Sequence, residues 1–251
     1  MSAPGTPGCL ATIDVVILAG GLGTRLRPAI GTLPKILAPV AGRPFLDHLL
    51  DRLAGFGVRR VILALGYRAD AVQTAIAARA PATMTLVPLV EPEPLGTAGA
   101  LRFVRRSILS DPVLVLNGDS VTEVDLCAFL AAHRRTAAAI SMVCTEAADT
   151  GRFGRIDIAP AGRVAGFREK AETGGPGLIN AGIYLLAAPV LDAIAGSAAS
   201  SFEREILAVQ PTGTIHAFAG RFAFIDIGTP QSLSEAATFF ARPGEAGSAP
   251  T

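Results

Sequence analysis

The chain has 251 residues, of which 50% are hydrophobic, and its formal net charge is +1. This length and apolar fraction suit one large folded domain and exclude general disorder. A nearly neutral chain lacks the polybasic surface that binds nucleic acid, and no apolar run approaches the roughly 20 residues that cross a bilayer, so neither partner is expected.

The first half of the chain predicts a parallel sheet. Residues 1–12 are rich in Gly, Pro, Ser and Thr and are expected to form a flexible tail that lacks the layout of a secretory signal, which favours a cytoplasmic location. Strand-like runs then alternate with helical patterns, which is typical of βαβ units. The strands are expected at 15–19, 61–65, 84–90 and 113–117, and the helices at 44–56, 69–80 and 97–108. The carboxyl ends of such strands form the usual ligand crevice.

The second half has shorter apolar runs separated by turns. Runs at 140–144, 154–158, 164–167 and 179–186 predict a β-rich lobe over about 136–222, which faces a nucleotide half over about 13–135. A strand at 223–227 and a helix at 230–240 complete a single domain over 13–241, and residues 242–251 are expected to form a flexible tail. The predicted class is α/β, with a Rossmann-like, mixed but mostly parallel sheet flanked by helices.

Cysteine and histidine chemistry has little support. Cys9, Cys127 and Cys144 are too few and too scattered for a disulfide framework or a zinc site, so each is expected to be structural or incidental. None of the three histidines lies near a serine or cysteine in a triad-like setting, which argues against a hydrolase.

A glycine-rich loop follows the first predicted strand. Its sequence is LAGGLGTRLRP (18–28), and Pro34 and Lys35 come shortly after. Glycines let the backbone approach an anion, and Arg25 and Lys35 supply charge that neutralises a triphosphate. A dinucleotide fingerprint would need glycine at Leu26, and a P-loop needs a Gly-Lys pair that the chain lacks. The alternative, a tight turn with solvated cations, is disfavoured by the combined pattern.

These residues resemble the sugar-phosphate nucleotidylyltransferases. The matching segments are LAGGLGTRLRP (18–28), LPKILAPV (33–40), EPLGTAGAL (93–101), NGD (117–119), GFREK (166–170), LINAGIY (178–184) and IDIGTP (225–230). Nearly the whole chain is covered. Departures at Ala29, Ile30, Ile36 and Ala171 remove no charged group. The resemblance implies the nucleotide-diphospho-sugar transferase fold and transfer of a nucleotide to a sugar 1-phosphate.

Two aspartates are the candidate metal ligands. Asp119 follows one predicted strand and Asp226 lies in another, so both are expected to reach the same crevice. Mg²⁺ commonly takes one or two carboxylates and fills its other positions with water and phosphate. A plain Asn-Gly-Asp turn is the alternative. Within this resemblance, Mg²⁺ between Asp119 and Asp226 is the prediction.

The resemblance also implies roles for the other site residues. The catalytic residues are expected to be Arg25, Lys35, Asp119 and Asp226. Contacts to the nucleotide are expected from Leu18, Ala19, Gly20, Gly21, Gly23, Thr24, Arg25, Glu91, Gly96 and Thr97. Contacts to the sugar phosphate are expected from Gly154, Glu169, Lys170, Asn180 and Gly182, although Glu169 and Lys170 also fit a solvated charge pair. The nucleophile is an anionic phosphate oxygen, so no general base is needed.

Four segments resemble those of guanylyltransferases: EPLGTAG (93–99), RFGRID (152–157), GPGLIN (175–180) and SFERE (201–205). Glu91 can accept from two adjacent donors of guanine, whereas a glutamine there suits a pyrimidine. Glu93 or a merely solvated Glu91 are the alternatives, as is a uridylyl- or thymidylyltransferase. The resemblance implies D-glycero-α-D-manno-heptose 1-phosphate as the sugar substrate, with mannose 1-phosphate second. A homo-oligomer is possible, and a non-catalytic sugar-nucleotide-binding subunit is disfavoured because Arg25, Lys35, Asp119 and Asp226 are all present.

Overall fold

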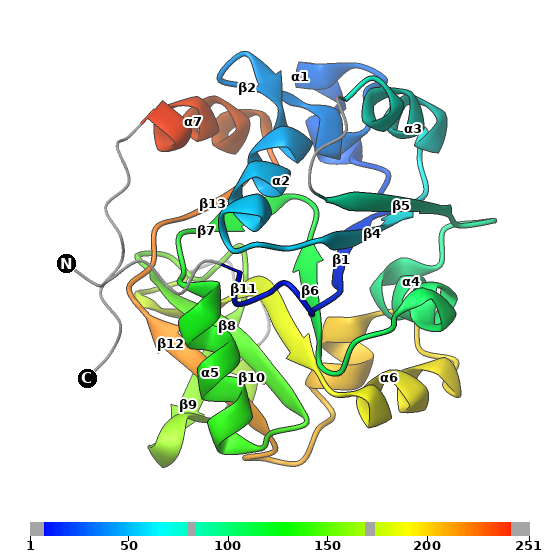
Figure 1. Ribbon diagram of the computed structural model, residues 1–251. Coiled ribbons are helices and arrows are strands. Elements are labelled where there is room, and N and C mark those ends of the chain that lie inside the picture. The colour runs from blue at the N-terminus through cyan, green and yellow to red at the C-terminus, as the bar shows by residue number, and fades with distance from the viewer. Residues whose placement is uncertain (1–7, 80–83, 169–173, 242–251) are drawn as a thin grey trace.

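The computed structural model describes residues 8–79, 84–168 and 174–241. Its main strands are β1 (Val15–Ala19), β4 (Arg60–Leu65), β5 (Thr85–Val90), β6 (Val113–Asn117), β8 (Ile140–Ala147), β9 (Arg155–Ala159), β10 (Arg163–Arg168), β11 (Gly177–Leu186) and β12 (Ile215–Gly220). Within these residues they form one nine-stranded sheet in the order β5-β4-β1-β6-β11-β8-β12-β10-β9 (Figure 1).

Helices cover both faces of this sheet. They are α1 (Arg27–Ile30), α2 (Phe45–Gly55), α3 (Ala69–Ala77), α4 (Gly96–Val104), α5 (Leu126–Thr136), α6 (Ala188–Ala195) and α7 (Pro230–Ala241). One core takes apolar side chains from α2, α3, α5 and α7, and the other from α4 and α6. Side chains of a strand alternate between faces. Ile17 of β1 accordingly lies in the first core and Val16 in the second.

The two halves of the sheet differ in direction. The run β5-β4-β1-β6 is parallel, as predicted for the nucleotide half. Beyond it, β11 is antiparallel to both β6 and β8, β12 is parallel to β8, and β10 is antiparallel to β12 and β9. The mixed α/β sheet is confirmed, but "mostly parallel" holds only for the nucleotide half. The predicted β-rich lobe continues the same sheet.

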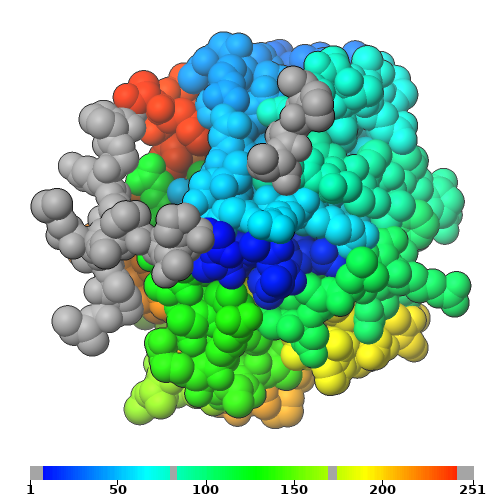
Figure 2. Space-filling model, viewed as in Figure 1, coloured from blue at the N-terminus to red at the C-terminus, as the bar shows by residue number. Residues whose placement is uncertain are grey.

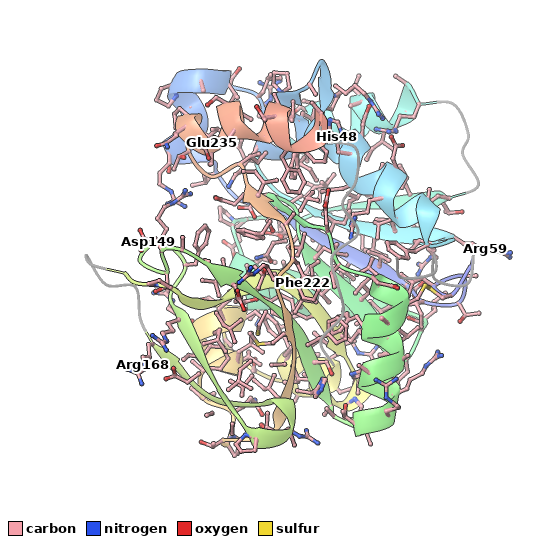
Figure 3. All side chains as sticks on the ribbon, turned by 90° about the vertical axis from the view of Figure 1, so that its left-hand side faces the viewer. His48, Arg59, Asp149, Arg168, Phe222 and Glu235 are labelled. Atoms are coloured by element: carbon pink, nitrogen blue, oxygen red, sulfur yellow. A yellow bond between two sulfur atoms is a disulfide. The ribbon has the colours of Figure 1, made fainter. Side chains whose placement is uncertain are left out.

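Two short strand pairs lie outside the large sheet. β7 (Ser120–Thr122) pairs antiparallel with β13 (Phe224–Asp226), and β2 (Pro39–Val40) pairs with β3 (Arg43–Pro44). The first pair connects the end of β6 to a segment about a hundred residues later. α7 then returns to α2, where the ring of Phe240 stacks on His48 at 4.0 Å between centroids; His48 is labelled in Figure 3.

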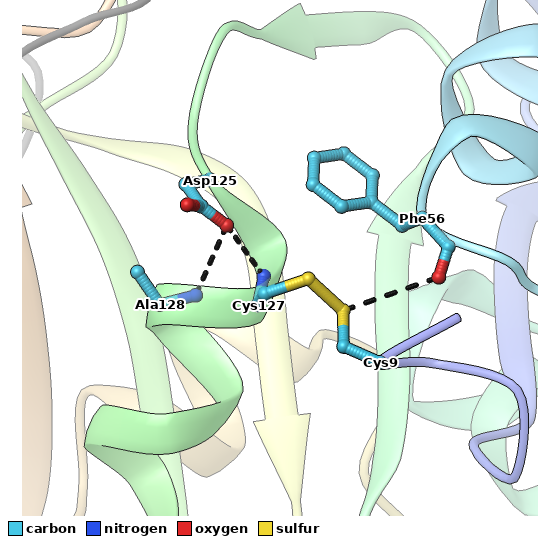
Figure 4. The surroundings of a disulfide bond; sticks show 5 residues. All are labelled: Cys9, Phe56, Asp125, Cys127 and Ala128. Carbon is cyan, nitrogen blue, oxygen red and sulfur yellow. Dashed lines mark hydrogen bonds between the residues drawn. A yellow bond between two sulfur atoms is a disulfide. The ribbon is translucent and has the colours of Figure 1, made fainter. Parts of the chain in front are cut away.

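The prediction of a flexible tail over residues 1–12 is wrong for its described part, residues 8–12. Leu10 is 1% exposed, and its N–H donates to the carbonyl of Phe56 at 3.2 Å. Cys9 forms a disulfide with Cys127, which lies 118 positions later in α5 (Figure 4). In Figure 2 the dark blue part of the chain, to which this segment belongs, lies on the surface between cyan residues above it and green residues below it. The expectation that the cysteines form no disulfide framework therefore missed one long-range link.

Several elements were not predicted. α5 begins after Asp125, whose carboxylate accepts from the N–H groups of Cys127 and Ala128 at 2.8 and 3.0 Å, an ordinary N-cap. α6 and β12 also lack a prediction.

The helices that the structure describes include none that is long and apolar enough to cross a membrane.

Candidate active site

The glycine-rich loop leaves the carboxyl end of β1. The carbonyl of Leu18 accepts from the N–H of Gly118 at 2.9 Å, so the loop lies beside the segment that follows β6. The loop also rests on Glu91, because a Cβ added to Gly20 would stand 2.8 Å from Glu91 Oε1. Only glycine allows this close approach.

A pocket of about 390 Å³ opens above this loop, here called the first pocket. Every residue predicted to contact the nucleotide lines it: Leu18, Ala19, Gly20, Gly21, Gly23, Thr24, Arg25, Glu91, Gly96 and Thr97. Lys35, Asn117 and Asp119 line it as well. The structure thus brings together loop, helix and strand-end residues that the sequence placed in one site.

Glu91 is a buried carboxylate of this pocket. It is 8% exposed, and its Oε2 accepts from the N–H of Leu95 at 3.2 Å. Burial raises the pKa of Glu91, and the hydrogen bond from Leu95 opposes that shift only in part. The alternative of a solvated Glu91 is therefore wrong. Glu93 is exposed and is not among the residues that line the first pocket.

The two predicted metal ligands lie on neighbouring backbone segments. Asp226 ends β13, where it pairs with Ser120, and the N–H of Ile227 donates to the carbonyl of Asp119 at 2.9 Å. Lys35 Nζ lies 2.6 Å from Asp119 Oδ2. A Cβ added to Gly228 would stand 2.5 Å from Asp226 Oδ2 and 3.5 Å from Lys35 Nζ. Asp119 pairs with Lys35, and both Asp226 and Lys35 lie beside Gly228.

A second pocket of about 580 Å³ adjoins the first. Of the residues predicted to contact the sugar phosphate, Gly154, Asn180 and Gly182 line it, together with Asp226. Glu169 and Lys170 lie outside the described residues. Arg25, Asn117 and Asp119 line both pockets, so the two cavities meet at these side chains.

Asn180 is held in a fixed orientation at the second pocket. Its Nδ2 donates to Tyr184 Oη at 2.7 Å, and its Oδ1 accepts from the N–H of Gly182 at 3.0 Å. Tyr184 is fully buried, and this burial, assisted by the charge of Glu203, raises the pKa of its hydroxyl well above the ordinary value. A protonated Tyr184 therefore anchors Asn180 at neutral pH.

Sequence reasoning assigned no role to several residues of the pockets. Asn117, Arg152, Glu203 and Arg204 all line the second pocket. Asn117 Oδ1 is buried and has no hydrogen-bond partner among residues 8–79, 84–168 and 174–241. Each residue lies within a motif that carries the resemblance, Asn117 in NGD (117–119), Arg152 in RFGRID (152–157), and Glu203 and Arg204 in SFERE (201–205). The motifs themselves were the available signal, but residue type alone did not separate pocket residues from surface ones.

A family model identifies the class of protein to which this fold and these paired pockets belong. The family model described as "Nucleotidyl transferase" matches residues 14–242. The chain belongs to this family, and the resemblance to the sugar-phosphate nucleotidylyltransferases is confirmed.

Two curated relatives of similar sequence are guanylyltransferases that act on sugar 1-phosphates. The chain is 33% identical over 224 residues to the mannose-1-phosphate guanylyltransferase of Mycobacterium tuberculosis, covering 88% of this chain but 62% of that relative. It is 31% identical over 225 residues to the D-glycero-alpha-D-manno-heptose 1-phosphate guanylyltransferase of Aneurinibacillus thermoaerophilus, covering 89% of this chain and 96% of that relative.

Solved structures agree on the fold. HddC from Yersinia pseudotuberculosis, solved also in complex with GMP-PN, superposes with a TM-score of 0.81 at 34% identity, covering 91% of this chain and 99% of that one. UTP-bound UGPase from Acinetobacter baumannii has a TM-score of 0.76 at 18% identity, covering 94% of this chain and 95% of that one, and shows the fold alone.

Proposed function

We propose that this protein joins GTP to a sugar 1-phosphate, forming a GDP-sugar and releasing pyrophosphate. The observation that carries the proposal is the meeting of the two pockets at Arg25, Asn117 and Asp119. A nucleotide in the first pocket and a sugar phosphate in the second would present their phosphates to each other at these residues. D-glycero-α-D-manno-heptose 1-phosphate is the first candidate sugar and mannose 1-phosphate the second, in line with the names of the similar enzymes.

Asp119 and Asp226 are proposed to hold Mg²⁺. The donor set fits, because Mg²⁺ prefers carboxylate oxygens and keeps positions for water and phosphate. Asp119 and Asp226 also border one cavity, because both line the second pocket. Bound there, the ion would neutralise phosphate charge and connect the two substrates.

The chain's own residues supply alignment and charge. The attacking phosphate oxygen is already anionic, so the site needs no general base, and catalysis comes from positioning and electrostatic stabilisation. Arg25 lines both pockets and is placed to stabilise charge that develops on the leaving pyrophosphate. Lys35, at the edge of the first pocket, is placed to bind the phosphates once Asp119 has another cationic partner.

Glu91 is proposed to select guanine. A carboxylate only accepts hydrogen bonds, and guanine presents two adjacent donors, N1–H and the N2 amino group. Glu91 borders the first pocket, and one of its oxygens is already occupied by Leu95. The carboxylate is thus fixed in place, and it retains lone pairs for the base.

A panel of substrates tests the proposal. GTP, UTP, dTTP and ATP are each combined with the heptose, mannose and glucose 1-phosphates, and both pyrophosphate and the sugar nucleotide are measured. Formation of a GDP-sugar with a manno-configured substrate is the expected result. A preference for UTP or dTTP would overturn the guanylyl assignment, and no product with any pair would favour a non-catalytic binding protein.

A further inference from the structure

The two pockets are connected by a direct hydrogen bond between side chains. Thr97, which lines the first pocket, donates from Oγ1 to Oε2 of Glu203, which lines the second, at 2.8 Å. The same hydroxyl accepts from the N–H of Phe202 at 2.8 Å. The hydroxyl of Thr97 is therefore fully engaged in holding the segment that carries Glu203.

Packing holds this segment against the start of α4. The N–H of Ala98 donates to the carbonyl of Ser200 at 2.9 Å, and any side chain at Gly96 would collide with that carbonyl. Phe202 is fully buried, and its ring meets that of Tyr184 edge-on, with 5.0 Å between centroids. Glu203 accordingly sits on a rigid support, as a residue that selects a ligand must.

Glu203 leaves one oxygen for a ligand. Among the residues that the structure describes, Oε1 of Glu203 has no hydrogen-bond partner, whereas Oε2 is bound by Thr97. The charge of Glu203 acts on Tyr184, whose hydroxyl holds Asn180, so Glu203 and Asn180 border one region of the second pocket. A carboxylate repels phosphate and accepts from donors, so this region is suited to hydroxyl groups.

We propose that Glu203 accepts a hydrogen bond from a hydroxyl of the sugar ring, and that Thr97 is the positioning residue that orients it. The inference rests on the proposed function, because the second pocket must hold the sugar. It adds a determinant of sugar selectivity to the residues that the sequence motifs predicted. Thr97, which lines the nucleotide pocket, would thereby contribute to sugar binding without contacting the sugar.

Glu203→Gln is the direct test. The glutamine would turn its carbonyl oxygen to Thr97 and its amino group to the sugar, or the reverse, so it cannot accept from both. We expect kcat/KM for α-D-mannose 1-phosphate to fall about tenfold to a hundredfold, the size typical of a hydrogen bond to a charged group. The Kd for a non-hydrolysable GTP analogue should stay unchanged. Glu205→Gln is the matched control, because Glu205 lies in the same π-helical segment, Phe202–Leu207, is exposed and lines neither pocket.

Substrate analogues and Thr97 variants separate selectivity from a structural defect. With the monodeoxy analogues of mannose 1-phosphate, the loss caused by Glu203→Gln should disappear for the one analogue that lacks the contacted hydroxyl. Thr97→Val removes the hydroxyl at nearly constant shape and should raise the KM for the sugar phosphate, whereas Thr97→Ser should not. In the Glu203→Gln background, Thr97→Val should add little.

The outcomes distinguish this proposal from the proposed function. An unchanged kcat/KM in Glu203→Gln, or an equal loss with every analogue, overturns the role of Glu203 while the enzyme assignment stands. A wild type that makes no GDP-sugar overturns both.

Discussion

Arg152 donates from Nη2 to both carboxylate oxygens of Asp226, at 2.9 and 3.1 Å. Lys35 donates from Nζ to one oxygen of Asp119, Oδ2, at 2.6 Å. Each aspartate proposed to bind Mg²⁺ therefore has a cationic side chain as its partner, and a metal ion must compete with that partner for the carboxylate. The Arg152 side chain is 46% exposed and that of Asp226 is 16% exposed, so solvent weakens the pair.

Arg152→Met should strengthen metal binding. The variant removes the competing charge and keeps an apolar stem beside the ring of Phe153, over which the guanidinium of Arg152 lies at 5.1 Å. Because a partly exposed ion pair contributes about 0.2–1 kcal/mol, we expect the affinity for Mn²⁺, used as a probe for Mg²⁺, to rise by up to about fivefold. Titration followed by electron paramagnetic resonance measures this. Arg155→Met is the control, because Arg155 pairs with Asp157. Equal affinities in all three proteins would contradict the competition.

Asp226→Asn should abolish most of the turnover without unfolding the protein. The amide keeps the shape of the side chain and the hydrogen bond from Gly228, but it removes a negative ligand. We expect kcat to fall at least about a hundredfold, the size typical of losing one electrostatic contact to a transition state. Rates at limiting Mg²⁺, with circular dichroism as a check on folding, test this. Near-normal turnover at limiting Mg²⁺ would remove Asp226 from the metal site.

Arg25→Ala should act mainly on kcat. Arg25 lies where both pockets meet. Its positive charge is therefore proposed to stabilise the negative charge that develops on the leaving pyrophosphate. Losing an interaction that is made chiefly in the transition state lowers kcat and kcat/KM together and leaves the KM for GTP nearly constant. Steady-state kinetics decide between the two patterns. A variant whose KM rises at unchanged kcat would show that Arg25 stabilises the bound substrate and the transition state equally.

Glu91→Gln should lower the selectivity for GTP and raise the thermal stability at neutral pH. Because burial raises the pKa of Glu91 in the folded protein, the ionised side chain costs stability at neutral pH, and that cost disappears as the pH falls below the ordinary carboxyl pKa. The variant should therefore gain Tm relative to the wild type at pH 7 and gain less at pH 4. Its preference for GTP over UTP should fall about tenfold or more. An unchanged GTP-to-UTP ratio would exclude Glu91 from base recognition.

The disulfide predicts a simple thiol count. Burial raises the pKa of the Cys144 thiol to about 12, so it should not react with iodoacetamide in the native protein at pH 8. Mass spectrometry should find no label on native unreduced protein, one after unfolding and three after unfolding with reductant. Three labels without reductant would contradict the Cys9–Cys127 bond.

Removing the bond should destabilise the fold. Cys9→Ser should lower the free energy of unfolding by about 2–4 kcal/mol, since the bond closes a long loop in the unfolded chain. Denaturant titration of the oxidised protein measures the loss, with Cys144→Ala as a comparison that leaves the bond intact. Disulfides are typical of oxidising compartments, which does not favour the predicted cytoplasmic location. That location stays a prediction.

The sequence by itself determined the elements whose cause is local. Strands β1 and β6 coincide with the predictions over residues 15–19 and 113–117. A run of apolar β-forming residues between turn residues indicates a strand without any information about its distant partners. The glycine-rich loop follows from the same local signals, since its glycines directly succeed a predicted strand. Glu169 and Lys170 lie outside the described residues, and their roles stay predictions.

Only the tertiary structure decided which distant side chains meet. Cys9 joins Cys127 across 118 positions, Arg152 joins Asp226 across 74, and Thr97 joins Glu203 across 106. Each contact depends on how whole strands and helices pack, and periodicity carries no information about the partner of a polar side chain on another element. The motifs therefore predicted where the phosphates bind, whereas packing placed Arg152 beside Asp226 and Thr97 beside Glu203.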